Sequence, residues 1–381
     1  WLKCGPISPP RCAGRRLWTL LAAMLPAAAL IAAARRSPTC AGAASLPRLA
    51  ASSRAALATA SGGAAPQLHL ETPLVHSLPL SNHLGADVFL KLDCLQPPGS
   101  FKIRGIGNTV RTAVERGAKH IVSSSGGNAG LAAAYAARSL NVPCTVVLPS
   151  TTSLEVHERL RSFGAEVVVH GDVWDVADCR ARELGEEKNG GYVHPFDQAT
   201  TWRGHATIVE ELAKQLPSTP DAIVTCVGGG GLLMGILDGI DLVGWSGKTR
   251  VVFGETEGAA SLAGSLKAGE LITLPGVASV AKSLGALTVS RSVFERCRAL
   301  GPELVRPFVM SDAAAVRACM RLANEHRLLV EPACGAALAA VTERSKELEG
   351  CKTVVVEVCG GAITSLDLMA MWARDLGIQD S

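Results

Sequence analysis

Four consecutive glycines and the leucine after them are the first residues whose type and spacing could do chemistry: Gly228, Gly229, Gly230, Gly231 and Leu232. They directly follow an apolar run, Ala222–Val227, that has the length and composition of a buried strand. Glycines let backbone N–H groups crowd around an anion, and a helix that begins there adds positive potential. A tight turn ordinarily needs one or two glycines, so the motif predicts a phosphate-binding turn. It matches neither GxGxxG nor a P-loop.

Lys102 is the second candidate, next to Phe101 in the run Pro98–Gly105. It stands between a Pro-Gly turn and an apolar helix pattern, where its amine would be partly desolvated. Desolvation disfavours the ammonium form and leaves a nucleophilic amine, which Schiff-base chemistry needs. Taken alone the signal is weak, because most lysines near a helix start are solvated.

A third segment, Ser123–Gly130, also leads from a strand into a helix. Its hydroxyls and free N–H groups suit a carboxylate, and Asn128 either caps the helix or points its amide at a ligand. Cys359 ends a later strand, before Gly360 and Gly361. By default such a cysteine is a small buried hydrophobe.

Short β-branched runs alternate with helical patterns from Leu68 onward. The expected strands are Ala86–Asp93, His120–Ser125, Cys144–Pro149, Glu166–Gly171, Gly191–Pro195, Ala222–Val227, Arg250–Glu255 and Lys352–Val358. The expected helices include one from about Phe101, Asn128–Leu140, Ser153–Phe163, Val173–Glu187, Asp312–Arg327 and Pro332–Leu348. Strands that are apolar on both faces and alternate with helices predict an α/β fold with parallel sheets covered on both sides. Ligands of such sheets bind at the carboxyl ends of strands, where these motifs fall.

Composition excludes several classes of protein. The chain has 381 residues, 48% of them hydrophobic and 19% charged, enough for two domains with large cores. Residues 1–70 carry eight basic side chains and no acidic one; the rest has 29 basic and 34 acidic residues, so no basic stripe indicates nucleic-acid binding. The twelve cysteines form no CxxC pair, which argues against a disulfide framework and a zinc site.

Residues 1–65 differ from the rest of the chain. An apolar run at 17–34, with arginine pairs on both sides, precedes an Arg-, Ser- and Ala-rich stretch. This composition is typical of an organelle transit peptide or a signal segment, and the run is marginal for spanning a membrane. Because the chain starts at Trp1, the segment could also be translated sequence upstream of the true start. The expected location is cytoplasmic or organellar (mitochondrion or plastid), depending on whether this leader targets the protein.

Together these segments resemble the fold-type II pyridoxal-phosphate enzymes, and specifically the eukaryotic serine dehydratases and serine dehydratase-like proteins. The similarity runs from about Thr72 to Gly377 and rests on GSFKIRGIGN, SSGGNAGLAAAYAAR, GGGGLL, SVAKSLGA and VEPACGAALAAV. It implies two open, twisted, mostly parallel sheets flanked by helices. The large cofactor-binding domain would comprise residues 66–93 and 200–381, and the small domain residues 94–199.

The resemblance also implies roles for individual residues. Lys102 would bind pyridoxal phosphate as a Schiff base, with Phe101 beside the ring, Asn128 at its 3-hydroxyl oxygen and Cys359 at its nitrogen. The residues from Gly228 to Leu232 would hold the phosphate, and Ser125, Gly126 and Gly127 would lie in the loop that receives the substrate carboxylate. A monovalent cation, usually potassium, would bind at Glu255, Ala259, Leu284 and Ala286, where carbonyls supply most ligands. A homodimer is also implied.

The implied reaction removes water and ammonia from L-serine or L-threonine and leaves pyruvate or 2-oxobutanoate, with Lys102 taking the α-proton. The alternatives are a serine racemase, a β-replacement enzyme of the same fold, and a cofactor-holding regulatory protein without turnover. Related racemases have a serine at the position matching Gly126, which has no side chain to give. Gly126→Ser is therefore expected to add reactivity toward D-serine. The choice between serine and threonine stays open.

Overall fold

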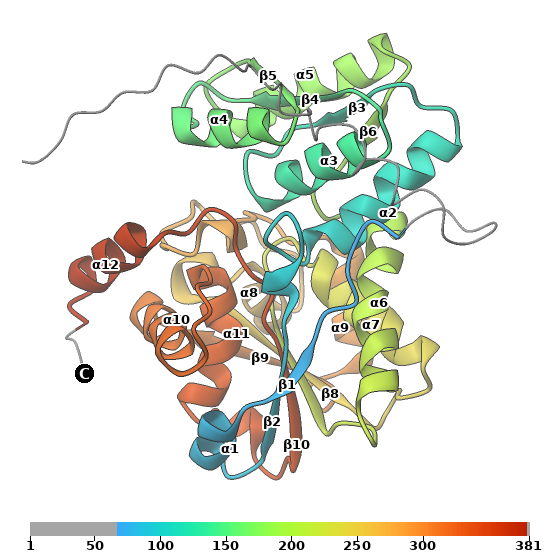
Figure 1. The fold of residues 1–381 in the computed structure, drawn as a ribbon. Coiled ribbons are helices and arrows are strands. Elements are labelled where there is room, and N and C mark those ends of the chain that lie inside the picture. The colour runs from blue at the N-terminus through green and yellow to red at the C-terminus, as the bar shows by residue number, and fades with distance from the viewer. Residues whose placement is uncertain (1–66, 379–381) are drawn as a thin grey trace, which may run out of the picture. The chain divides into compact units, whose positions relative to one another are not determined.

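The computed structural model describes residues 67–378, which carry two separate β-sheets (Figure 1). The leader predicted for residues 1–65, with its apolar run at 17–34, lies outside the described residues. In the described part of the chain, no helix is long and apolar enough to cross a membrane.

Strands and helices alternate along most of the chain. The strands are β1 (Leu74–His76), β2 (Asp87–Lys91), β3 (Ile121–Ser123), β4 (Cys144–Leu148), β5 (Glu166–Val169), β6 (Gly191–Val193), β7 (Ala222–Cys226), β8 (Arg250–Thr256), β9 (Val305–Met310) and β10 (Thr353–Glu357). The helices are α1 (Leu78–Leu84), α2 (Lys102–Glu115), α3 (Asn128–Ser139), α4 (Leu154–Ser162), α5 (Trp174–Glu187), α6 (Ala199–Gln215), α7 (Gly231–Leu242), α8 (Ser261–Ala268), α9 (Arg291–Leu300), α10 (Asp312–His326), α11 (Pro332–Thr342) and α12 (Leu366–Asp375).

The larger sheet has the order β1-β2-β10-β7-β8-β9 and is parallel except for β1, which runs antiparallel to β2. Strands β7 and β10 are almost wholly apolar and buried, as expected for strands covered on both faces. Helix α7 packs on β7 from one side, and α11 packs on β7 and β8 from the other (Figure 1). The main hydrophobic core of the molecule lies in these two layers.

The smaller sheet is all parallel, in the order β5-β4-β3-β6. Neighbouring residues on β3 point to opposite faces, as the strand period of two requires. Ile121 joins a core with α2 and α3, whereas Val122 joins a core with α5. Helices therefore cover both faces of this sheet as well.

The predicted fold class is confirmed, and all eight predicted strands form with both ends within two residues of the expected positions. The strands of the small sheet all come from residues 121–193, within the range predicted for the small domain. The division of the chain at residues 93/94 and 199/200 remains a prediction.

Two expectations about elements need correction. The helix expected over Pro332–Leu348 ends at Thr342, because Arg344 adopts a left-handed backbone (φ 49°) that breaks the helical hydrogen bonds. Strand β9 was not expected at all. It lies at the edge of the large sheet and contains Pro307, which an edge strand tolerates although it argues against a strand in a sequence pattern.

Helix α2 is held in place by a buried ion-pair cluster, which consists of Lys91, Asp93, Arg104 and Glu211. Arg104 is fully buried and bonds both Asp93 oxygens (2.6 and 2.7 Å) and both Glu211 oxygens (2.6 and 2.8 Å). Lys91 Nζ lies 2.6 Å from Glu211 Oε2. These charge-assisted bonds tie α2 to β2 and α6 and so fix the position of Lys102, two residues before Arg104.

Candidate active site

A narrow cavity lies at the carboxyl ends of β7 and β10, and most of the predicted site residues line it. Its walls are Phe101, Lys102, Asn128, Phe196, Cys226, Gly228, Gly229, Gly230, Gly231, Leu232, Ser283, Leu284, Glu331, Ala333 and Cys359. The structure thus brings together the lysine, the asparagine, the four glycines and the cysteine that the sequence separates by up to 257 positions. Its location agrees with the rule for ligand sites in open α/β sheets.

Lys102 is the first residue of α2, and its half-buried side chain reaches into this cavity. Nζ donates to the Pro195 carbonyl (2.7 Å) and lies 5.3 Å from the centre of the Phe101 ring. Burial lowers the pKa of Lys102 from its ordinary value to about 8, and weaker electrostatic effects of its neighbours, Glu331 among them, oppose this shift. A substantial fraction of the amine is therefore neutral near physiological pH, and neutral amine is the nucleophilic form.

Backbone hydrogen bonds connect the turn before Lys102 to the loop after β10, and they hold Lys102 close to Cys359. Phe101 N donates to Cys359 O (3.0 Å), and Gly361 N donates to Gly99 O (3.0 Å). Gly360 has φ +97°, and an added Cβ would lie 2.4 Å from Gly99 O, so only glycine fits there.

The glycine turn presents its N–H groups to the cavity. Within residues 67–378, no acceptor bonds the N–H groups from Gly228 to Leu232; the first backbone bond of α7 runs from Met234 N to Gly230 O. Such free donors at a helix N-terminus form an anion site. Packing also requires glycine in this turn: a Cβ on Gly229 would lie 2.3 Å from the Phe196 ring, and one on Gly231 would lie 2.6 Å from Phe196 O. Phe196 is itself a wall of the cavity, so close packing and space for an anion both favour glycine in this turn.

Asn128 does not cap α3; the N-cap is Gly127, and the Asn128 amide turns into the cavity. Ala362 N donates to Asn128 Oδ1 (3.0 Å), and Asn128 Nδ2 donates to Glu331 Oε1 (2.9 Å). The capping alternative is therefore wrong, and one N–H of the amide is left for a ligand.

Cys359 lies two residues beyond β10 and belongs to a group of buried thiols. Its Sγ is 3.7 Å from Cys226 Sγ, and hydrogen bonds with Cys226 and Cys334, together with burial, raise its pKa well above the ordinary value. The thiol therefore keeps its proton.

Ser125 and Gly126 do not line the cavity. They lie in the loop between β3 and α3, where Ser125 Oγ accepts a bond from Gly127 N (3.3 Å). Behind the loop, the Ser124 and Tyr192 hydroxyls both donate to Asp178. The substrate-binding role of Ser125 and Gly126 remains a prediction.

The predicted cation residues lie near the carboxyl end of β8. Glu255 is buried, and its two oxygens accept bonds from Leu262 N (3.0 Å) and Ala263 N (2.8 Å); burial raises its pKa to about 7. Ala259 and Leu284 are also buried, and Leu284 O accepts from Ala286 N (2.8 Å). Within residues 67–378 no three His, Cys, Asp or Glu side chains are grouped as metal ligands, so a cation here would depend on carbonyls. The cation site remains a prediction.

Residues missed by the sequence reasoning include Glu331, Phe196 and Cys226. Glu331 immediately precedes Pro332, which begins α11, and an acidic residue at such a helix start is normally interpreted as a cap. Phe196 belongs to the site through its contact with the glycine turn, and no local sequence pattern predicts that contact.

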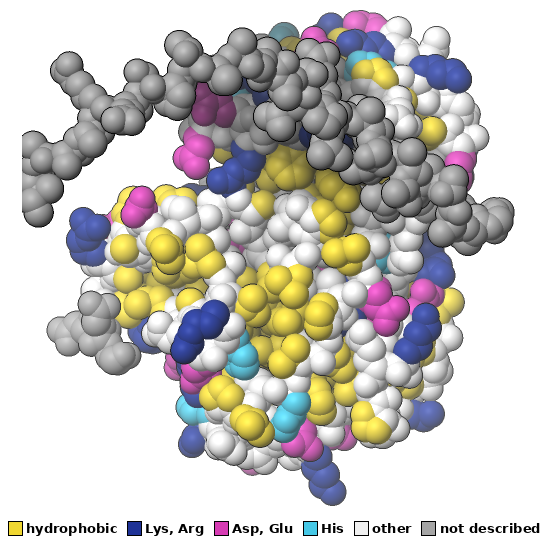
Figure 2. All heavy atoms as spheres, viewed as in Figure 1, with side chains coloured by type: hydrophobic (Ala, Val, Ile, Leu, Met, Phe, Trp, Pro, Cys, Tyr) yellow, Lys and Arg dark blue, Asp and Glu magenta, His cyan; other side chains and the backbone are white. Residues whose placement is uncertain are grey.

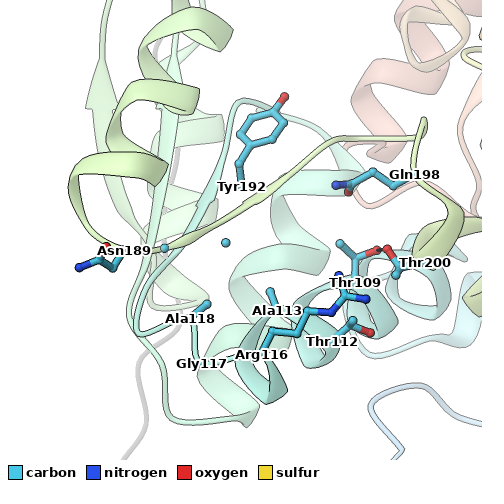
Figure 3. A pocket seen from close by; sticks show the side chains of 12 residues that line it. Thr109, Thr112, Ala113, Arg116, Gly117, Ala118, Asn189, Tyr192, Gln198 and Thr200 are labelled. Atoms are coloured by element: carbon cyan, nitrogen blue, oxygen red, sulfur yellow. Dashed lines mark hydrogen bonds between the residues drawn. The ribbon is translucent and has the colours of Figure 1, made fainter.

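A larger hollow, of about 520 Å³, lies at the other end of α2 (Figure 3). Its polar groups are largely paired: Thr109 Oγ1 bonds the hydroxyls of Thr200 and Thr201, and Tyr192 turns its hydroxyl away toward Asp178. Lys102, Asn128, the glycine turn and Cys359 all line the smaller cavity, so that cavity is the candidate active site.

Comparisons with known proteins agree with this geometry. Residues 66–360 match the family model described as "Pyridoxal-phosphate dependent enzyme". The chain is 47% identical over 312 residues to a serine dehydratase-like protein of Homo sapiens (80% of this chain, 94% of that one), and 46% identical over 321 residues to an L-serine dehydratase/L-threonine deaminase of Bos taurus (82% and 97%). Its structure resembles a fungal L-serine ammonia-lyase from Rhizomucor miehei, with a TM-score of 0.75 and 36% identity over 81% of this chain and 99% of that one. The chain therefore belongs to the family of pyridoxal-phosphate dependent enzymes.

Proposed function

We propose that this protein is a lyase that eliminates water and ammonia from L-serine or L-threonine, with pyridoxal phosphate bound to Lys102. The observation that carries the proposal is a desolvated lysine in the same cavity as a row of unpaired N–H groups. The relatives named as serine dehydratases and threonine deaminases support the choice of substrate.

The residues of the cavity fit the cofactor. The free N–H groups of the glycine turn suit its phosphate, the Lys102 amine suits its aldehyde, and the free N–H of Asn128 suits its ring oxygen. The cavity volume is about 50 Å³, below the roughly 300 Å³ of small-molecule sites. The walls must therefore move apart when the cofactor enters, and Lys102 must leave the Pro195 carbonyl.

Pyridoxal phosphate, when bound, supplies a ring that withdraws electrons from the α-carbon of the amino acid. Lys102 would be the base that takes the α-proton, because it is the lysine that lines the cavity and its lowered pKa leaves a substantial fraction of the amine neutral. Cys359 keeps its own proton and so cannot act as a carboxylate partner that holds the ring nitrogen protonated. This favours rapid elimination over transamination.

The loop of Ser125 and Gly126 is our candidate for the substrate carboxylate. Its position is supported by the bonds from Ser124 and Tyr192 to Asp178 and by the bond from Trp174 Nε1 to Ser124 O (3.1 Å). This network holds the end of β3 against α5, so the loop N–H groups have a rigid base.

The relatives named as serine dehydratases and threonine deaminases favour elimination over racemisation. The geometry changes one expectation, however. A Cβ on Gly126 would meet Leu148 (3.2 Å) and Val156 (3.3 Å), neither of which lines the cavity. Gly126→Ser would therefore point its hydroxyl at apolar neighbours, and we no longer expect it to add reactivity toward D-serine.

The test is a steady-state assay of the purified protein with L-serine and with L-threonine, measuring 2-oxo acid and ammonia alongside chiral chromatography. We expect equal amounts of oxo acid and ammonia and negligible D-serine. D-serine forming as fast as pyruvate would replace the dehydratase with a racemase, and cofactor binding without ammonia release would favour the regulatory alternative.

We also propose a homodimer that uses the face around β1. Figure 2 shows hydrophobic side chains gathered in the middle of this face, over β1 and the loop between β2 and α2. Val75, Leu78 and Leu95 are exposed there, and β1 is the edge of its sheet. Apolar patches of this kind mark association surfaces. Light scattering should give twice the chain mass, and Leu78→Glu with Val75→Lys should reduce it to one chain; a monomeric parent would refute the dimer.

A further inference from the structure

Glu331 is a buried acid at the cavity wall that the reaction described above does not use. It is the N-cap residue of α11, yet its side chain accepts no bond from the helix N–H groups. Its backbone carbonyl accepts the first bonds of the helix, from Cys334 N (2.9 Å) and Gly335 N (3.1 Å), and the carboxyl takes no part in them. The carboxyl therefore does not cap its own helix and can bond a group on another element.

That group is Asn128, on an element 203 residues away in sequence. Because Ala362 N can only donate, it fixes the amide with Oδ1 toward Ala362 and Nδ2 toward Glu331. Glu331 Oε1 accepts one Nδ2 hydrogen at 2.9 Å. The bonds to Ala362 and Glu331 fix the plane of the amide, and this sets the direction of the second Nδ2 hydrogen.

Glu331 is itself held rigidly. An added Cβ on Gly361 would lie 2.4 Å from Glu331 Cγ, so the loop after β10 packs directly on the carboxyl stem. The groups that face the carboxyl are Lys102 from α2, Asn128 from α3 and Ser283 from the 3-10 turn η3 (Lys282–Leu284). The Cys319 thiol of α10 bonds the Glu331 carbonyl.

We propose that Glu331 is a positioning residue, which orients the Asn128 amide toward the cofactor ring. This inference rests on the proposed cofactor site and goes beyond it, because it assigns a role to the acid behind the asparagine. An isosteric amide at position 331 can still accept the Asn128 bond, whereas an apolar side chain leaves a buried donor unpaired.

Because Glu331 Oε2 has no fixed partner in the described part of the chain, the charge of the Glu331–Asn128 pair should depend on pH. Oε2 has no hydrogen-bond partner among the described residues, although the Ser283 hydroxyl lies close enough to favour its charged form. Burial raises the pKa of Glu331 to about 7, against weaker opposing effects of Ser283, Asn128 and Lys102. Deprotonation near neutrality would place a negative charge beside Lys102 and Asn128.

The experiment compares Glu331→Gln and Glu331→Leu with Glu343→Gln, a control at the other end of α11. Pyridoxal phosphate is titrated into each apoprotein, and the visible and near-ultraviolet bands of the lysine-bound cofactor are recorded between pH 5.5 and 9. Their ratio reports where the proton near the ring oxygen lies, which a purely structural role would not move.

We expect Glu331→Leu to weaken cofactor affinity about tenfold, the effect of one lost hydrogen bond to a buried donor. Glu331→Gln should keep affinity within about threefold, since the bond to Asn128 survives, but its band ratio should no longer change near pH 7. The control should behave like the parent. Parent-like affinity in Glu331→Leu, or a parent-like spectral titration in Glu331→Gln, would overturn the proposal.

The apoprotein gives a readout that does not involve the cofactor. A carboxyl whose folded pKa is raised holds more protons when folded than when unfolded between pH 4.5 and about 7, so its contribution to stability falls as pH rises through that window. The melting temperature of Glu331→Gln relative to that of the parent should therefore rise between pH 5 and pH 8. A difference that stays constant with pH would contradict the raised pKa of Glu331.

Failure of the parent to release ammonia from L-serine would refute the proposed reaction alone, because the spectra and melting curves need only cofactor binding and folding.

Discussion

Two groups of buried polar side chains lie within one turn of each other at the start of α2, and they differ in how fully they are paired. In the ion-pair cluster around Arg104, every charged group meets an opposite charge. In the active-site group, Lys102 donates to a neutral carbonyl and Glu331 has one oxygen without a partner in the described structure. The start of α2 thus contributes Arg104 to a fully paired structural network and Lys102 to a site whose polar groups are incompletely paired.

The pKa shifts follow this difference. Burial alone would raise the pKa of Asp93, but the charge and hydrogen bonds of Arg104 outweigh it and hold the pKa below its ordinary value. Lys102 and Glu331 lack such compensation, so burial moves the pKa of both toward neutrality, to about 8 and about 7. Removing one partner of a paired buried charge is strongly destabilising, whereas a charge buried without such a partner has a shifted pKa and becomes available for chemistry.

The largest effect should come from breaking the ion-pair cluster. Arg104→Met keeps the apolar stem but leaves Asp93 and Glu211 without their main counter-charge. We expect a loss of about 3–5 kcal/mol in the free energy of unfolding of the apoprotein. Urea unfolding measures it, with the exposed Arg138→Met as a control that should change by less than about 0.5 kcal/mol. A loss below about 1 kcal/mol for Arg104→Met would erase the contrast between the two groups.

Gly229→Ala tests why the active-site turn contains four glycines. Its Cβ would meet the Phe196 ring at 2.3 Å, so we expect overpacking to cost about 1–3 kcal/mol even without cofactor. Gly276→Ala is the matched control, because no atom lies within 4 Å of its added Cβ. If Gly229→Ala melts like the parent and only cofactor affinity falls, the glycines serve the anion rather than the packing.

Lys102→Met should have the smallest effect on stability, and its sign should depend on pH. A folded pKa lowered from 10.5 to about 8 means that the folded parent binds fewer protons between those values, so its stability rises with pH across that window. The Met variant should be more stable than the parent at pH 7, on the order of 1 kcal/mol after solvent screening, and should lose this advantage above pH 8. Denaturant unfolding of both apoproteins from pH 7 to pH 10 checks this; a constant gap would mean that the amine is solvated.

Much of the fold and of the candidate site could be predicted from local sequence. The glycine turn directly follows an apolar strand, and Lys102 comes three residues after Gly99 of a Pro-Gly turn, so each could be predicted from its own neighbourhood. Strand β9 could not, since its alternating burial and Pro307 are typical of an edge strand that only its place in the sheet explains.

Long-range partners were beyond the pattern. Asn128 could be assigned to the site, but Glu331 becomes its partner only when α3 and α11 meet, and nothing in the sequence around Glu331 indicates this. The packing of Phe196 on Gly229 is also a contact between distant segments. Both depend on the tertiary arrangement of loops, which propensities and spacing do not encode.

The most direct test of the central claim is the identity of the lysine that binds the cofactor. The protein is saturated with pyridoxal phosphate, reduced with sodium borohydride and digested, and the modified peptide is identified by mass spectrometry. We predict a single phosphopyridoxyl label on Lys102, and loss of the label together with all ammonia release in Lys102→Ala. A label on another lysine, or ammonia release that survives Lys102→Ala, would contradict the account.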